Sequence, residues 1–101
     1  GVNACRFEGP LPSEIGLLWN LTRLTVQKNR FTGTIPGSYG KLAMLEQFTS
    51  EGNLLSGTIP ISVCDLTKDN LRQFVVDCYD KRKGIGFDCQ PHCCTLCRDV
   101  Q

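Results

Sequence analysis

The sequence predicts an α/β solenoid, in which short parallel strands line one face and 3-10 or irregular segments form the convex side. The first observation is a repeated segment: residues 29–36 (NRFTGTIP) recur as residues 53–60 (NLLSGTIP), at an offset of 24 residues (53 − 29 = 24). The second is that apolar residues recur at fixed distances before each of these segments. The third is that five of the seven cysteines fall within residues 78–97, which predicts a disulfide-rich C-terminal cap.

Each coil is expected to begin with a short strand whose side chains alternate between the interior and the exposed face. A strict period would start the third strand at Asp69, but the leucine comes two residues later, so residues 67–70 contain an insertion. No coil can bury its own apolar edge, so stacking has to stabilise the array. The inward positions of the three coils are Leu21, Leu24 and Val26, then Leu45, Phe48 and Ser50, then Leu71, Phe74 and Val76.

An asparagine follows each of the first two strands, at Asn29 and Asn53. We expect both side chains to turn inward and bond to the backbone of neighbouring coils, because a buried turn would otherwise leave its polar groups unpaired. Cys5 falls on the same repeat position, which predicts a small buried free thiol, with an intermolecular disulfide as the alternative. Gly33 and Gly57 then hold a position that is expected to exclude a β-carbon.

The pattern Asn-x-Phe/Leu-x-Gly-Thr-Ile-Pro, together with Pro-Ser-Glu-Ile-Gly at residues 12–16, resembles the plant-specific subclass of leucine-rich repeats. The resemblance covers residues 1–78 and implies a secreted or receptor-like protein, as in receptor-kinase ectodomains and polygalacturonase-inhibiting proteins. The tail departs from the plant pattern. Its Asp77-Cys78 pair and the later Cys-Cys-x-x-Cys cluster resemble the terminal caps of leucine-rich repeat proteins from diatoms and related algae.

The repeat register divides the chain into leucine-rich repeats at 1–78, about three and a half coils, and a cysteine-rich cap at 79–101. The same register places Gly1-Val2 in the middle of a strand, so Val2, Phe7, Leu11 and Ile15 would leave an apolar open end. We therefore expect the chain to be the C-terminal part of a longer array, or to have this end covered by a partner chain.

Setting Cys5 aside leaves six cysteines, whose pairing the sequence leaves open. A bridge from Cys64 to Cys78, or from either of them to the tail, would fix the last coil. A zinc site built from the tail cysteines and His92 is the main rival, and redox chemistry at residues 94–97 is another. Disulfides are favoured, and no metal or cofactor is predicted. The predicted disulfide cysteines are Cys64, Cys78, Cys89, Cys93, Cys94 and Cys97.

Charge and composition exclude several classes of function. The formal net charge is +1, which gives no electrostatic reason to expect nucleic acid or an anionic membrane as a partner. No apolar run approaches the ~18 residues that a membrane-spanning helix needs. The single histidine, His92, cannot be combined with a nucleophile and an acid into a catalytic group, so we expect no enzyme activity.

The outward strand positions form polar columns that we expect to bind a protein, peptide or cell-wall glycan outside the cell or at its surface. Solvated strand positions without a ligand are the plain alternative. A second functional hypothesis is a structural or assembly subunit whose repeat surface and open N-terminal end dock onto other chains. Asn20-Leu21-Thr22 is an N-glycosylation sequon, so Asn20 is a predicted modification site. The candidate ligand-binding residues are Arg23, Thr25, Gln27, Lys28, Gln47, Thr49, Glu51, Gln73 and Asp77.

Overall fold

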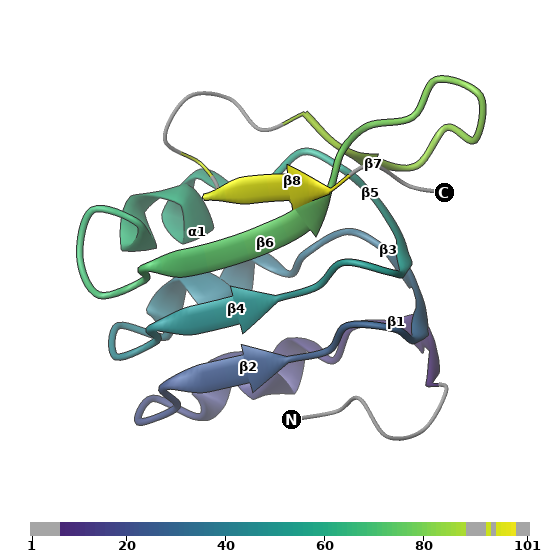
Figure 1. Ribbon diagram of the computed structural model, residues 1–101. Coiled ribbons are helices and arrows are strands. Elements are labelled where there is room, and N and C mark those ends of the chain that lie inside the picture. Colours follow the sequence, from purple (N-terminus) through teal and green to yellow (C-terminus); the bar gives the residue numbers. More distant parts are fainter. Residues whose placement is uncertain (1–6, 89–92, 94, 99–101) are drawn as a thin grey trace.

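The computed structural model describes residues 7–88, 93 and 95–98 of the chain. Its coils stack so that equivalent strands pair in parallel (Figure 1). One sheet has four strands in the order β2, β4, β6 and β8. This arrangement confirms the predicted α/β leucine-rich repeat solenoid with short parallel strands. The strands of this first sheet are β2 (Arg23–Thr25), β4 (Gln47–Thr49), β6 (Gln73–Asp77) and β8 (Leu96–Arg98).

A second parallel sheet, which the sequence analysis did not anticipate, follows the turn after each strand of the first sheet. In β3, Phe31 is buried while its neighbours Arg30 and Thr32 are exposed, and Leu55 repeats this alternation in β5. One buried residue per strand is too short a pattern to indicate a strand from the sequence. The strands of the second sheet are β1 (Glu8–Pro10), β3 (Arg30–Gly33), β5 (Leu54–Gly57) and β7 (Gly86–Phe87).

Short helices lie side by side on the convex side, as the sequence predicts. The first two, η1 (Ser13–Leu17) and η2 (Gly37–Lys41), are 3-10 helices, and the third, α1 (Ile61–Leu66), is an α-helix. Each begins after a proline with extended backbone angles, at positions 12, 36 and 60. Proline suits this place because its missing N–H would have no partner in the first helical turn.

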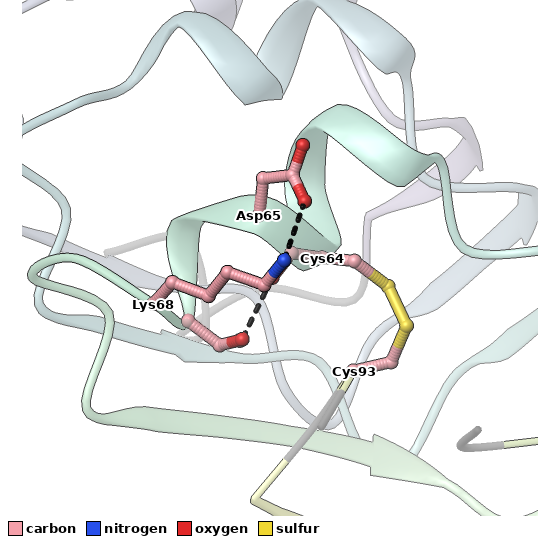
Figure 2. The surroundings of a disulfide bond; sticks show 5 residues. Cys64, Asp65, Lys68 and Cys93 are labelled. Carbon is pink, nitrogen blue, oxygen red and sulfur yellow. Dashed lines mark hydrogen bonds and ion pairs between the residues drawn. A yellow bond between two sulfur atoms is a disulfide. The ribbon is translucent and has the colours of Figure 1, made fainter. Parts of the chain in front are cut away.

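Glycine allows these helices to approach closely. A β-carbon on Gly16 would collide with the carbonyl oxygen of Ser38 in the next coil, and one on Gly40 would collide with the side chain of Ser62. The same repeat position in α1, the last helix of the described chain, is Cys64. Its side chain is directed to the C-terminal tail instead of meeting another helix (Figure 2).

The core lies between the two sheets and the helices and consists of one stacked layer per coil. The rings of Phe48 and Phe74 are nearly parallel, with centroids 5.2 Å apart, which repeats one contact from coil to coil. Tyr39 is fully buried, and its hydroxyl donates a hydrogen bond of 2.8 Å to the carbonyl oxygen of Pro12 in the preceding coil. Burial, with a contribution from the Glu14 carboxylate, raises the pKa of the Tyr39 hydroxyl, so it stays protonated as a donor.

The predicted asparagine ladder is present. Asn53 accepts a hydrogen bond of 3.1 Å from the backbone N–H of Phe31 in the preceding coil. Its amide nitrogen donates to the carbonyl oxygens of Val26 at 2.9 Å and Ser50 at 3.0 Å. Asn29 repeats the pattern by accepting from the N–H of Phe7 at 2.9 Å. Both side chains are buried, so each satisfies backbone groups that water cannot reach.

The C-terminal cap continues both sheets. β7 pairs with β5, and β8 pairs with β6, each in parallel. Thr95, just before β8, reinforces the second pairing: its hydroxyl accepts from the N–H of Phe74 at 2.9 Å, and its own N–H donates to the Phe74 carbonyl oxygen at 2.9 Å. The tail therefore adds one parallel strand to each sheet, in the place where a further coil would add its own strands. The predicted boundary between repeats and cap at residue 78 stays a prediction.

Two disulfides attach the cap to the last coil. Cys64 in α1 is joined to Cys93, with a Cα–Cα distance of 4.6 Å, and Cys78 is joined to Cys97, at 4.8 Å. Figure 2 shows the first bridge running from α1 to the tail, beside the surface ion pair of Lys68 with Asp65. Both bridges go to the tail, so the considered Cys64–Cys78 pairing was wrong.

The bridges also weigh against the zinc alternative, because Cys93 and Cys97 are no longer available as thiolate ligands. The predicted disulfide cysteines Cys89 and Cys94 and the predicted free thiol Cys5 lie outside the described residues. None of the helices that the structure describes has the length and apolar character needed to cross a bilayer.

We expect replacement of Asn53 by alanine to lower the free energy of unfolding by about 3 kcal/mol, because it leaves buried backbone groups of two coils unpaired. Urea denaturation measures the effect. Asn70→Ala is the matched control: the Asn70 amide also donates to a backbone carbonyl of the preceding coil, that of Ala43, but at the surface. The control is expected to cost about 0.5 kcal/mol. Equal losses in the two variants would contradict the ladder as a source of stability.

Removing either bridge by paired cysteine-to-serine changes should lower the free energy of unfolding by about 2–4 kcal/mol, since the reduced unfolded chain regains loop freedom. The Cys78–Cys97 pair closes 19 residues and the Cys64–Cys93 pair closes 29. Hydrogen exchange should show a local difference as well, with the amides shared by β6 and β8 losing protection first in the variant that lacks Cys78–Cys97. Unchanged protection there would be inconsistent with this bridge holding β8.

Candidate functional site

The exposed face of the first sheet collects the candidate residues into rows that run across the strands. Pairing between β2, β4 and β6 sets Arg23 opposite Gln47, and Gln47 opposite Gln73. Thr25, Thr49 and Val75 form the next row by the same pairing. The parallel register places equivalent side chains next to one another, as the repeat period predicts.

The row of Arg23, Gln47 and Gln73 is the most accessible. Arg23 and Gln73 are exposed, and Gln47 is half-buried between them. One guanidinium and two carboxamides give this row both hydrogen-bond donors and acceptors, with a single positive charge. Such a row can bind peptide groups or hydroxyls of a ligand that runs across the strands.

The second row is less accessible. Thr25 is half-buried, and Thr49 and Val75 are buried. The Thr49 hydroxyl donates a 2.5 Å hydrogen bond to the side-chain oxygen of Gln27, which ties the second row to the third. Thr49 therefore contributes to the rigidity of the face, and its hydroxyl already has a partner inside the protein.

The third row combines Gln27, Glu51 and Asp77. Gln27 and Glu51 are half-buried, but Asp77 is buried. The Asp77 carboxylate accepts hydrogen bonds from the backbone N–H of Gly52 at 3.0 Å and of Asn53 at 3.2 Å. Asp77 therefore holds the turn of the preceding coil.

Lys28 is the only non-glycine residue with a positive φ in the part of the chain that the structure describes, at 61°. One coil later the equivalent residue is Gly52, with a φ of 78°, which is the usual solution for this backbone conformation. The cost of a left-handed conformation at a residue with a β-carbon is about 1–2 kcal/mol. Lys28 is exposed in the turn that follows β2.

The cap extends the face further than the sequence suggested. In β8, Leu96 lies opposite Val75 and Arg98 lies opposite Asp77. The step from Val75 to Leu96 is 21 residues (96 − 75 = 21), shorter than the repeat period, so the register failed to predict this strand. The sequence signal that could have indicated this strand is Thr95, which precedes an apolar residue. Its hydroxyl accepts a hydrogen bond from the backbone N–H of Phe74.

Two other predicted sites, the glycosylation site Asn20 and the free thiol Cys5, do not belong to these rows. Asn20 is exposed, in the turn between η1 and β2, on an edge of the sheet and outside the rows. Cys5 lies outside the described residues. Among the residues that are described, no three His, Cys, Asp or Glu side chains lie together as a metal site requires.

The fold and the polar face define a leucine-rich repeat solenoid, and comparisons with known proteins agree. The Leucine Rich Repeat family model matches residues 20–42. A solved structure, the leucine-rich repeat ectodomain of the plant membrane receptor kinase GASSHO1/SCHENGEN3 from Arabidopsis thaliana in complex with CASPARIAN STRIP INTEGRITY FACTOR 2, is similar, with 39% identity and a TM-score of 0.59. No match is found among curated proteins.

The similarity covers 65% of this chain and 8% of the receptor ectodomain, so the chain spans a small part of that protein's length. Together the family match and the receptor support a leucine-rich repeat protein of the plant type. The resemblance of the cap to algal proteins stays a prediction.

We expect Lys28→Gly to raise the free energy of unfolding by up to about 1 kcal/mol. Glycine removes the strain of the left-handed conformation, which stabilises the folded state by more than the added backbone freedom stabilises the unfolded chain. Gly52→Ala is the matched control at the equivalent position. Its β-carbon would lie 3.2 Å from the Lys28 backbone nitrogen at a positive φ, so a loss of at least about 1 kcal/mol is expected. Urea denaturation of both variants measures the two shifts. A loss in Lys28→Gly would mean that the lysine itself stabilises the turn.

Proposed function

We propose that this chain is part of an extracellular recognition protein that binds a protein or peptide through the exposed face of the first sheet. The observation that carries the proposal is the accessible row of Arg23, Gln47 and Gln73 on a parallel sheet whose last strands are fixed by two disulfides. Carboxamides and a guanidinium suit the peptide groups of an extended polypeptide, which offers a donor and an acceptor at every residue. A cell-wall glycan, with its hydroxyls, is the other ligand class that this chemistry fits.

Support for a protein or peptide ligand comes from the Arabidopsis receptor ectodomain, which was solved in complex with CASPARIAN STRIP INTEGRITY FACTOR 2. Support for an extracellular location comes from the same comparison and from the Cys64–Cys93 and Cys78–Cys97 bridges, since disulfides persist in oxidising compartments. Non-catalytic binding is the function that we assign to the face.

The size of the face sets a limit on what the described coils bind alone. Adjacent strands lie about 4.8 Å apart, so four strands span roughly 14 Å between the first and last. A stable protein interface uses about 800 Å² per partner. We infer that the described face contributes one end of a longer binding surface.

A further coil or a partner chain is the second element of the proposal. Of the residues expected to form an apolar open end, Leu11 is buried and Ile15 is half-buried, so the expectation was wrong for these two. Phe7 is 45% exposed, whereas its repeat equivalent Phe31 is 5% exposed. Stacking of a preceding coil, or of another chain, on η1 and β1 would bury Phe7 as Phe31 is buried. This exposed end is also the observation that favours the rival hypothesis, in which the chain serves as an assembly subunit.

The binding face is tested with a triple variant, Arg23→Ala/Gln47→Ala/Gln73→Ala. Immobilised wild-type chain is exposed to the secreted peptide and glycan fractions of the organism that makes it. The expected result is a protease-sensitive ligand whose affinity falls at least about tenfold in the variant, equivalent to about 1.4 kcal/mol. The solvent-facing positions of these side chains predict that the variant keeps its stability.

The matched control, Lys41→Ala/Asp65→Ala/Lys68→Ala, replaces exposed residues of the convex side and removes the same net charge of +1. It should bind like the wild type. Equal loss in both triple variants would contradict a specific site on the sheet. A ligand retained by the face variant but lost in Phe7→Lys would instead favour the assembly role.

A further inference from the structure

Three consecutive apolar side chains are exposed where η1 ends. Leu17 is 72% exposed, Leu18 is 50% exposed and Trp19 is 70% exposed. Leu18 has a simple explanation, because its repeat equivalent, Leu42, is fully buried by the coil that precedes it. A coil stacked on η1 would bury Leu18 in the same way.

Stacking does not explain the exposure of Leu17 and Trp19. Their repeat equivalents one coil later are Lys41 and Ala43, and both are exposed although a preceding coil is packed against theirs. In both of these coils the two positions therefore face solvent, with or without a preceding coil. The second coil fills them with a charged residue and a small one, whereas the first coil fills them with two large apolar residues. Contiguous exposed apolar residues of this kind usually mark a surface that is covered.

The residue that follows this apolar pair is Asn20, the acceptor of the sequon at residues 20–22. Asn20 is exposed in a turn whose backbone is fixed by two hydrogen bonds, from Leu21 N–H to the Leu18 carbonyl oxygen at 2.9 Å and from Trp19 N–H to the Leu17 carbonyl oxygen at 3.0 Å. The acceptor amide and the apolar pair are thus presented from one short, ordered segment.

We propose that Asn20 carries an N-linked glycan whose first sugars pack over Leu17 and Trp19. The glycan comes from a lipid-linked oligosaccharide pyrophosphate. A bond forms between the anomeric carbon of the first sugar and Nδ2 of Asn20, the anomeric C–O bond to the pyrophosphate breaks with its electron pair leaving on the pyrophosphate, and Nδ2 releases one proton. The inference rests on the proposed extracellular location, but it does not depend on the ligand of the sheet.

The oligosaccharide is the occupant that this position favours. The C–H faces of pyranose rings are apolar and pack against an indole ring, which removes both surfaces from water. A bulky glycan attached one residue from Trp19 would also hinder a protein partner from reaching the same pair. Asn20 precedes β2, and the loops before β2, β4 and β6 lie side by side where these strands begin (Figure 1). A glycan on Asn20 therefore leaves the rows of the candidate binding face open.

Occupancy is tested on the full chain made through a eukaryotic secretory pathway. Intact mass should show an added glycan that an amidase specific for N-linked glycans removes. Thr22→Ala destroys the sequon and should abolish the added mass, whereas the matched variant Thr22→Ser keeps the sequon and should retain it. An unmodified mass for the secreted wild-type chain overturns the proposal, as does an added mass that persists in Thr22→Ala.

Cover of the apolar pair is tested by fluorescence, because Trp19 is the single tryptophan of the chain. We expect the acrylamide quenching constant of the glycosylated protein to rise at least about twofold when the folded protein is deglycosylated enzymatically. This comparison uses one folded chain before and after treatment, so it needs no variant to fold. Equal quenching constants in the two states overturn the cover. Ligand capture by the sheet is measured separately, so failure of either proposal is distinguishable from failure of the other.

Discussion

The structure depends on hydrogen bonds that the side chains of Asn29 and Asn53 make between coils. Each amide satisfies buried backbone groups of its own coil and of the preceding coil. Because these bonds fix the spacing of successive turns, the strands before them pair in register and the aromatic rings behind them repeat one contact. Solenoid coils have little stability in isolation, so the interaction that joins neighbours determines whether the array exists.

The same requirement explains the form of the cap. A final coil leaves unpaired strand edges and apolar surface, which are a risk for association with other chains. The tail reduces that risk by covering these edges with two short strands, β7 in one sheet and β8 in the other, and the disulfides at Cys64 and Cys78 hold it at the convex side and just after β6. A short sequence with no repeat pattern can do this because covalent links replace the packing that a full coil would supply.

The repeat period predicted the solenoid, the inward residues and the asparagine ladder, because each follows from a side chain at a fixed distance along the chain. It did not predict the second sheet, whose strands bury one residue each, or β8, whose distance from β6 is set by the cap. The rows of the binding face followed from the register. What each residue does there did not: Asp77 holds a backbone turn and Thr49 bonds to Gln27, and neither contact is visible from spacing alone.

One repeat position in the stacked helices of the convex side is occupied by Gly16, then Gly40, then Cys64. This sequence of residues has a consequence for how the length of such an array evolves. Glycine at this position accepts a neighbour, and cysteine bonds to the tail, so one residue distinguishes an internal coil from the final one. Duplication or deletion of whole 24-residue units before α1 leaves this distinction intact. The length of the array can therefore vary by gene rearrangement, while the closed end is inherited as one unchanged module.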